Sequence, residues 1–241
     1  MIVNNVEKRY RDGTYLTHNP DWDRQECLWK AGLVKNVLDE FKIEPKTVCE
    51  IGCGTGDVLV HLKQFYPNYE FTGYDISPQV EQFWEEHKAE GIHFYCGDFL
   101  ALNKQYYDCI LLIDVIEHLS DPFKFLDAIQ EKPKYFVFQF PLDLSASTVL
   151  REKPLLNARL KVGHIHYFTK GLALAILQDA GFNIMHYRYT KAYLKGPNRS
   201  LKTRIAALPR RLVNYIAKDF GVRLLGGETL LVLAEAAGSV G

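Results

Sequence analysis

The sequence predicts an α/β domain in which helices cover both faces of a mostly parallel sheet. Short runs rich in β-branched and aromatic residues alternate with stretches of helical periodicity, as in strand–helix–strand units. Tyr107–Ile113 is almost wholly apolar, which is typical of a strand buried on both faces at the centre of such a sheet. Thr47–Ile51 ends at a glycine-rich turn before a helical pattern, an order typical of ligand sites in α/β folds.

The individual elements follow from this alternation and from helix start and stop signals. Asp121 suits a helix cap with Pro122 in the first turn, and Gly181 is a C-terminal stop. The strands are expected at Thr47–Ile51, Tyr69–Tyr74, Ile92–Tyr95, Tyr107–Ile113, Tyr135–Phe140, Phe182–Tyr189 and Thr229–Ala234. The helices are expected at Trp22–Phe41, Asp57–Phe65, Pro78–Lys88 and Thr169–Ala180, with one more that begins at Asp121.

The chain is expected to form a single domain over residues 1–241. A length of 241 residues with 47% hydrophobic and 24% charged residues suits one large globular α/β domain. We expect a helical cap at the N-terminus, about residues 1–44. The regular alternation breaks twice, which predicts insertions at about residues 142–166 and 191–226.

Charge and cysteine content exclude several classes of protein. The 29 basic residues equal the 29 acidic residues, so no global positive field favours nucleic acid as a partner. No apolar run is long enough to predict a membrane span, and the first residues lack the order of a secretion signal. The five cysteines are odd in number and lie mostly in apolar runs, which predicts free thiols and a cytoplasmic location.

The most informative segment is the glycine-rich turn after the first strand. Gly52, Gly54 and Gly56 alternate in a G-x-G-x-G pattern, which differs from the spacing of dinucleotide folds and phosphate loops. Such a turn brings bare backbone and a helix N-terminus close to a ligand. Asp75 follows at the end of the next strand, where a carboxylate is placed to accept hydrogen bonds from ribose hydroxyls.

One strand further, Asp98 and Phe99 suit an adenine amine and an adenine ring face. Together with the Glu50–Gly56 turn, Asp75 and the Tyr107–Leu119 segment, they resemble the motifs of class I S-adenosylmethionine (SAM)-dependent methyltransferases in order and spacing. The resemblance covers roughly residues 45–190 and the last strand. It implies a Rossmann-like sheet of seven strands with an antiparallel last strand, and SAM as the cofactor. The implied cofactor-binding residues are Glu50, Gly52, Cys53, Gly54, Gly56, Asp75, Ile76, Asp98, Phe99, Asp114 and Val115.

The segment after the central strand raises the question of a metal. If it is helical, Asp114, Glu117 and His118 lie on one face and offer ligands for a divalent ion. The segment is similar to the E-x-x-E-H motif of ubiquinone-type and small-RNA 2′-O-methyltransferases, which bind a metal. Here an aspartate with shorter reach stands first. We therefore expect metal-independent chemistry and keep Asp114, Glu117 and His118 as the ligands of the alternative.

Two further histidines precede the late helix. In an extended segment the side chains of His164 and His166 share a face, and an imidazole can take the proton that the acceptor loses. We predict His166 as the acceptor-side base and His118 as a second catalytic residue. A purely structural role for the histidine pair is the alternative, because Thr169 beside it is a good helix cap.

The predicted function is methyl transfer from SAM to an oxygen or nitrogen of a small-molecule acceptor, such as a metabolite or a glycan- or nucleotide-linked precursor. One alternative is a metal-assisted RNA 2′-O-methyltransferase with Asp114, Glu117, His118 and one of His164 and His166 around the metal. A non-catalytic SAM-fold binding protein is the other alternative. Acceptor specificity is expected on Tyr10–Trp22, 142–166 and 191–226. The basic Lys191–Arg223 stretch suits a phosphate-bearing acceptor, an anionic membrane surface or simple packing on the core.

Overall fold

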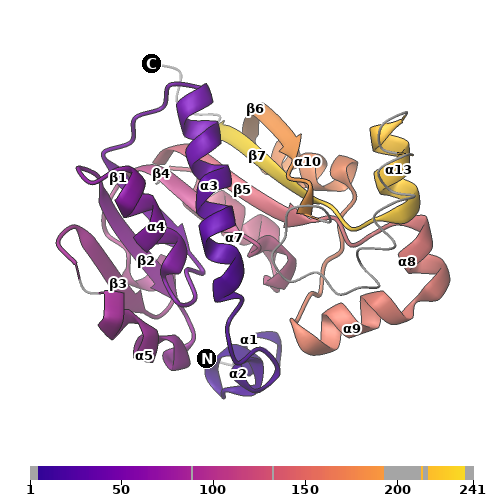
Figure 1. Cartoon of the computed structure of the whole chain (residues 1–241), viewed down its shortest axis with the longest axis horizontal. Coiled ribbons are helices and arrows are strands. Elements are labelled where there is room, and N and C mark those ends of the chain that lie inside the picture. Colours follow the sequence, from indigo (N-terminus) through magenta and orange to yellow (C-terminus); the bar gives the residue numbers. More distant parts are fainter. Residues whose placement is uncertain (1–4, 88, 132, 193–212, 214–216, 237–241) are drawn as a thin grey trace.

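The computed structural model describes residues 5–87, 89–131, 133–192, 213 and 217–236 (Figure 1). Most of the basic stretch therefore lies outside the described residues. The seven strands are β1 (Thr47–Ile51), β2 (Glu70–Asp75), β3 (Ile92–Cys96), β4 (Tyr107–Ile113), β5 (Pro133–Pro141), β6 (Phe182–Tyr189) and β7 (Thr229–Ala236). They form one sheet in the order β3-β2-β1-β4-β5-β7-β6. Only β7 of these seven runs antiparallel to its neighbours, which confirms the predicted Rossmann-like fold.

Helices lie on both faces of the sheet (Figure 1). The α-helices are α1 (Asn5–Arg11), α2 (Thr14–His18), α3 (Arg24–Glu40), α4 (Asp57–Phe65), α5 (Glu81–Trp84), α6 (Phe99–Leu102), α7 (Pro122–Ile129), α8 (Ala146–Arg151), α9 (Lys153–Lys161), α10 (Lys170–Asp179) and α13 (Lys218–Leu225). The 3₁₀ turns are η1 (Pro78–Val80), η2 (Glu85–His87) and η3 (Ile116–His118).

Side-chain alternation along the central strand divides the core into two halves. Cys109 and Leu111 of β4 pack with α3 and α4 on one face, while Ile110 and Leu112 pack with α7 and α10 on the other. All four side chains are fully buried. Burial of each leucine or isoleucine contributes about 1.5–3 kcal/mol, so both faces of the sheet hold the helices in place.

The strand order also fixes where a ligand can bind. The chain runs outward from β1 to β2 and β3 on one side and from β4 to β5 on the other. The loops that follow β1 and β4 therefore diverge at the carboxyl ends of these two neighbouring strands. A crevice at such a switch point is the usual ligand site of an open α/β sheet.

Two expectations for the elements are corrected by the structure. The single helix expected over Pro78–Lys88 is instead η1, α5 and η2 in succession. The irregular 142–165 stretch contains α8, which has a capping box between Ser145 and Thr148, and then α9. A break separates the two helices because Glu152 has a φ of 55°, which a helix cannot continue.

None of the helices within the described ranges has both the length and the apolar character needed to cross a bilayer.

Candidate active site

One pocket of about 710 Å³ opens at the carboxyl ends of β1, β2 and β4. The glycine turn and Asp75 line one end of it, and His118 and His164 line the other. Tyr10, Tyr15 and Trp22 of the N-terminal segment cover it. All the predicted cofactor-binding residues line this pocket except Gly56, which lies behind the turn against Phe94.

The glycine turn is held in a shape that side chains would prevent. Gly52 N and Cys53 N both donate to the carbonyl of Tyr74, at 2.7 and 3.0 Å, which ties the turn to the end of β2. Gly54 has a φ of 51°, and a Cβ there would stand 2.7 Å from Trp22 Nε1. The bare backbone therefore faces the pocket just before α4 begins, an arrangement that suits a polar or charged ligand.

Asp75 is held rigidly before any ligand binds. Its Oδ2 accepts a hydrogen bond from Gly54 N at 2.9 Å and its Oδ1 accepts one from Ser77 N at 2.8 Å. Burial raises the pKa of this carboxyl to about 6 despite these backbone donors. Each carboxylate oxygen can accept a second hydrogen bond, so Asp75 can still receive ligand hydroxyls.

Glu50 lies at the floor of the same end. Its side chain is buried, and burial raises the pKa of the carboxyl to about 8. Among the described residues, Oε2 of Glu50 has no hydrogen-bond partner. A buried carboxyl of this kind is stabilised by a donor or a cationic group of a ligand.

Asp98 and Phe99, the residues predicted to border the adenine, also have structural roles. Asp98 caps α6 by accepting a hydrogen bond from Leu100 N at 2.9 Å. The Phe99 ring is buried and packs edge-on against Tyr74, with the ring centroids 5.1 Å apart. Both residues line the pocket, but most of the Phe99 ring belongs to the core.

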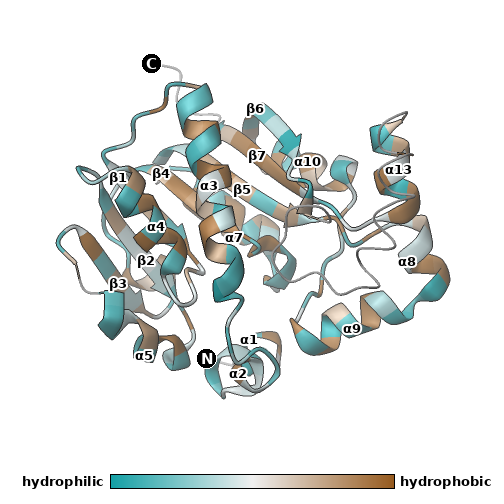
Figure 2. Cartoon of the chain, viewed as in Figure 1, coloured by the Kyte–Doolittle hydropathy of each residue, from teal (hydrophilic) through white to brown (hydrophobic). Residues whose placement is uncertain are grey.

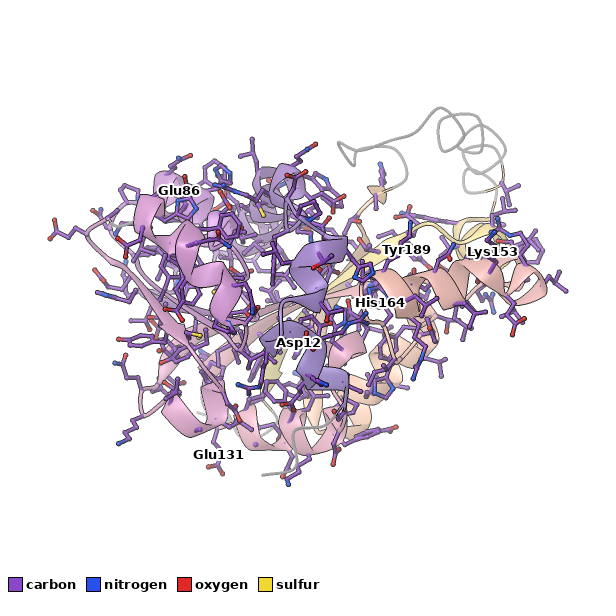
Figure 3. All side chains as sticks on the ribbon, turned by 90° about the horizontal axis from the view of Figure 1, so that it is seen from below. Asp12, Glu86, Glu131, Lys153, His164 and Tyr189 are labelled. Atoms are coloured by element: carbon purple, nitrogen blue, oxygen red, sulfur yellow. The ribbon has the colours of Figure 1, made fainter. Side chains whose placement is uncertain are left out.

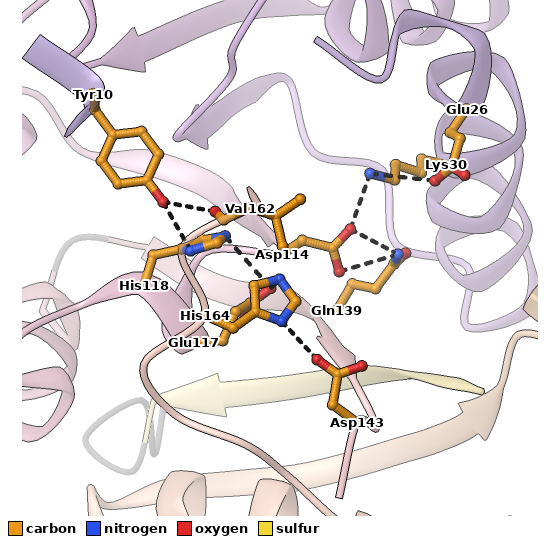
Figure 4. Close-up of polar contacts among 10 residues, drawn as sticks. All are labelled: Tyr10, Glu26, Lys30, Asp114, Glu117, His118, Gln139, Asp143, Val162 and His164. Carbon is orange, nitrogen blue, oxygen red and sulfur yellow. Dashed lines mark hydrogen bonds and ion pairs between the residues drawn. The ribbon is translucent and has the colours of Figure 1, made fainter. Parts of the chain in front are cut away.

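Asp114 does not join Glu117 and His118 on one helical face. Its φ is 55°, and the 3₁₀ turn η3 begins only at Ile116. Asp114 Oδ2 instead forms an ion pair with Lys30 Nζ of α3 at 2.9 Å. The predicted ligand set of Asp114, Glu117 and His118 is therefore not assembled (Figure 4).

The structure brings His164 to Glu117 and His118 instead, and we call these three residues the histidine cluster (Figure 4). Oε1 of Glu117 lies 3.8 Å from His118 Nε2 and 3.9 Å from His164 Nε2. The second nitrogen of each ring is held elsewhere: His118 Nδ1 lies 2.9 Å from the Tyr10 hydroxyl, and His164 Nδ1 lies 2.6 Å from Asp143 Oδ2. Both Nε2 atoms consequently face the same buried carboxyl.

Electrostatics keep part of this cluster uncharged at neutral pH. Burial, followed by the charge of Asp114, raises the pKa of the Glu117 carboxyl well above its usual range. Burial, followed by the proximity of His164, lowers the pKa of His118 to about 4. The three ligand atoms lie within 4.8 Å of one another, so the cluster fits two uses: acceptance of a proton, or binding of a divalent metal with Tyr10 and Asp143 orienting the imidazoles.

His166, the predicted base, does not reach the pocket. Its Nε2 lies 2.8 Å from the carbonyl oxygen of Leu119, and its backbone N–H donates to the carbonyl of Glu117 at 3.1 Å. The segment is a loop anchored on η3, so the shared face expected of a strand is lost. His166 therefore anchors this loop to η3, while His164 lines the pocket.

Sequence reasoning missed Tyr10 and Asp143. The Tyr10 carbonyl accepts a hydrogen bond from Ser77 Oγ at 2.6 Å, which fixes the N-terminal segment over the pocket. The only signal for Tyr10 was its place in a segment expected near the acceptor. No local pattern marked Asp143, because its contact with His164 depends on how α8 and α9 return to η3.

Comparisons with known proteins give one family. A sequence model described as "Methyltransferase domain" matches residues 22–187. Norajmaline N-methyltransferase of Rauvolfia serpentina is 35% identical over 100 residues, which are 38% of this chain and 33% of that protein. Demethylmenaquinone methyltransferase of Thermotoga maritima is 32% identical over 83 residues, 34% of each chain. The matched regions thus span about a third of these two relatives' own length.

Solved structures share the fold over nearly the whole chain. Magnesium protoporphyrin IX methyltransferase of Synechocystis, with bound SAH, has a TM-score of 0.54 at 20% identity and covers 98% of this chain and 89% of its own. The plantazolicin methyltransferase BpumL, in complex with a monoazolic desmethylPZN analogue and SAH, has a TM-score of 0.62 at 14% identity and covers 96% of this chain and 93% of its own. At these identities the likeness is one of fold.

Proposed function

This chain belongs to the class I SAM-dependent methyltransferases, and from that premise we propose that it methylates an oxygen or nitrogen of a small-molecule acceptor. The observation that carries the proposal is the shared pocket at the carboxyl ends of β1, β2 and β4. It joins a rigid glycine turn and Asp75 at one end to two inward-facing imidazoles at the other. A cofactor and an acceptor held in one pocket have the proximity that group transfer needs.

The cofactor end suits SAM. When bound, SAM supplies a methyl group on a positively charged sulfur, which is open to in-line displacement. Asp75 would accept the ribose hydroxyls, the backbone at Gly52–Gly54 would border the methionine part, and Glu50 would offer its unpartnered oxygen to the amino group. Asp98 and Phe99 would border the adenine. Each of these residues lines the pocket.

The acceptor end supplies a proton acceptor. With Tyr10 O–H donating to the Val162 carbonyl at 3.2 Å, His118 Nδ1–H donates to the Tyr10 oxygen. His164 Nδ1–H likewise donates to Asp143, so this assignment of tautomers leaves the Nε2 lone pairs of both rings facing inward. We assign His164 as the base that receives the acceptor proton, in place of His166, with His118 as its neutral neighbour.

A metal-assisted RNA 2′-O-methyltransferase is the second candidate, because the histidine cluster offers three ligand atoms within 4.8 Å of one another. Two observations favour the metal-free reading. Asp114, the first residue of the motif, is engaged by Lys30. The net charge of zero gives no general attraction for RNA.

The five cysteines support a reducing compartment for this enzyme. All five are free thiols, and four of them are buried. We therefore keep the cytoplasm as the proposed location.

The test uses the purified chain with methyl-labelled SAM and a small-molecule extract. The expected result is a labelled metabolite in the mass spectrum, absent when SAM is omitted. Label found only in RNA, or no transfer to any extract fraction, would overturn the small-molecule proposal.

A further inference from the structure

Three short helices, α8, α9 and α13, form one end of the molecule (Figure 1). α9 follows α8 after Glu152. Ser147 Oγ of α8 donates to the carbonyl of Leu225, the last residue of α13, at 3.1 Å, so α13 is tied to the same end. Figure 3 shows Lys153 near one end of the folded molecule, away from most of the sheet.

This end exposes an unusual share of apolar surface. Of the sixteen large hydrophobic side chains that are exposed in the described part of the chain, six belong to these helices. They are Val149, Leu150, Leu156, Leu160, Phe220 and Leu224. Leu150 is 86% exposed and Leu160 is 66% exposed. Brown segments on all three helices mark this surface in Figure 2.

Helical spacing gathers these side chains into stripes. Leu156 and Leu160 stand four residues apart on α9, and Phe220 and Leu224 stand four apart on α13, so each pair shares one helix face. Lys153 precedes Leu156 by three residues and lies on the same face. Exposed apolar side chains grouped in this way mark an interaction site.

The same helices carry an excess of positive charge, although the whole chain is neutral. Their exposed basic residues are Arg151, Lys153, Arg159, Lys161, Lys218 and Arg223, and their acidic residues are Glu152 and Asp219. Asp219 is already paired with Lys170 of α10. Within the described ranges, no carboxylate lies at ion-pair distance from Arg151, Lys153, Arg159 or Lys161.

Leucines interleaved with lysines and arginines are the composition of a surface that rests on an anionic bilayer. The apolar side chains enter the headgroup region while the basic groups meet lipid phosphates. We infer that α8, α9 and α13 form a docking face for an anionic membrane surface.

The docking face adjoins the histidine end of the pocket. Arg9 donates to the carbonyls of Arg159 and Leu160 in α9, each at 2.8 Å. Val162, the next residue after α9, accepts a hydrogen bond from Tyr10 and lines the pocket. A docked molecule thus holds the acceptor end of the pocket beside the bilayer, which favours an amphiphilic acceptor. That last step rests on the proposed function.

The test is co-sedimentation of the full chain with lipid vesicles. We expect binding to vesicles of phosphatidylcholine mixed with phosphatidylglycerol, none to phosphatidylcholine alone, and weaker binding at high salt. Lys153→Gln and Arg159→Gln should each lower the partition coefficient about fivefold, the equivalent of ~1 kcal/mol per basic residue. Leu150→Ser and Leu160→Ser should also lower it.

Matched controls are Lys104→Gln and Leu28→Ser, which alter exposed residues outside α8, α9 and α13 and outside the pocket. Equal binding to neutral and anionic vesicles, or equal losses in the controls, would overturn the inference. Sedimentation equilibrium that shows a dimer abolished by Leu150→Ser would assign the face to a second copy instead. Calorimetry with SAM on the same proteins separates membrane docking from the proposed methyltransferase function, because the docking variants should bind SAM as the unaltered chain does.

Discussion

Single side chains decide what each end of the pocket can do. Asp75 is a buried carboxylate already aimed by Gly54 N and Ser77 N, so in the proposed complex the ribose would meet a fixed acceptor. His164 is a pocket imidazole aimed by Asp143. In both cases a neighbouring group fixes the side chain before the ligand arrives, which lowers the entropy cost of binding and of reaction.

A single-turnover assay should distinguish the roles of His164 and His166, the two histidines before α10. His164→Asn removes the proposed base and should slow the chemical step by about 10²–10⁴-fold. His166→Asn is the matched control: it removes a contact to the Leu119 carbonyl and should lower the free energy of unfolding by about 1 kcal/mol with little change in rate. If the His166 variant is slow while the His164 variant keeps the normal single-turnover rate, His166 and not His164 is the base.

Asp75 should make SAM binding depend on pH. Its pKa is raised to about 6, and only the ionised carboxylate accepts both ribose hydroxyls. Affinity should therefore fall below about pH 6, approaching tenfold per pH unit for loss of one ionised group. Calorimetry across pH 5–8 measures this, and Asp75→Asn should flatten the profile.

The same raised pKa has the opposite effect on folding. Between the unfolded pKa near 4 and the native pKa of about 6, the native Asp75 carboxyl holds its proton more firmly than the unfolded chain does. Its contribution to stability is complete below about pH 4 and is lost as the pH rises through about 6. A ligand-free urea titration should show this trend, reduced in Asp75→Asn.

Chelation should leave methyl transfer unchanged once an acceptor is known. The proposed base works through an imidazole lone pair and needs no ion. The measurement compares rates before and after EDTA treatment and dialysis. Loss of activity that magnesium or manganese restores would show that Glu117, His118 and His164 hold a metal.

Among the secondary-structure elements, the helices that precede β1 complete the wall of the pocket. α3 reaches the pocket through Lys30, whose buried ammonium pairs with Asp114 at the end of β4. α1 and α2 reach it through Tyr10 and Tyr15. α1 is held in place by Ser77 and Gln79, whose side chains donate to the carbonyls of Tyr10 and Arg11. These contacts join segments far apart in sequence, so the N-terminal cap and the central strand form one wall.

The Lys30–Asp114 pair can be tested by removing one partner. Lys30→Met keeps the apolar stem but leaves the half-buried Asp114 carboxylate without its cation. The free energy of unfolding, measured in urea, should fall by about 2–3 kcal/mol, less than the ~3–5 kcal/mol of a fully buried pair because Asp114 is partly exposed. The double variant Lys30→Met/Asp114→Asn should recover part of this loss, and a fully additive loss would show that the pair is not coupled.

The sequence predicts most elements because long amphipathic helices and apolar strands carry their own patterns. β1, α4, β4 and β6 have the bounds that their patterns indicate. α8, α9 and α13 were not predicted, since each is short and exposes several of its apolar side chains. Their stability comes from contacts with one another and with the core, which a local pattern does not show.

At the scale of the whole molecule, the divergence of the chain at β1 and β4 creates the crevice, and the sequence predicts its cofactor side. Glu50, Asp75 and Asp98 lie at or just past the carboxyl ends of three successive strands, so their spacing alone places them at one edge. The acceptor side was harder to predict, because Tyr10 comes from α1 and Asp143 and His164 come from two separate loops, so their meeting depends on the tertiary structure.

The most direct test of the account is calorimetry of SAM binding to three proteins: the unaltered chain, Asp75→Ala and His164→Asn. We predict one SAM site per chain and no heat with NAD. Asp75→Ala should weaken SAM by about 1.5–3 kcal/mol, the cost of losing hydrogen bonds to a charged group, while His164→Asn should bind SAM normally. Unchanged affinity in Asp75→Ala, or no SAM binding by the unaltered chain, would contradict the claim that this pocket binds SAM through Asp75.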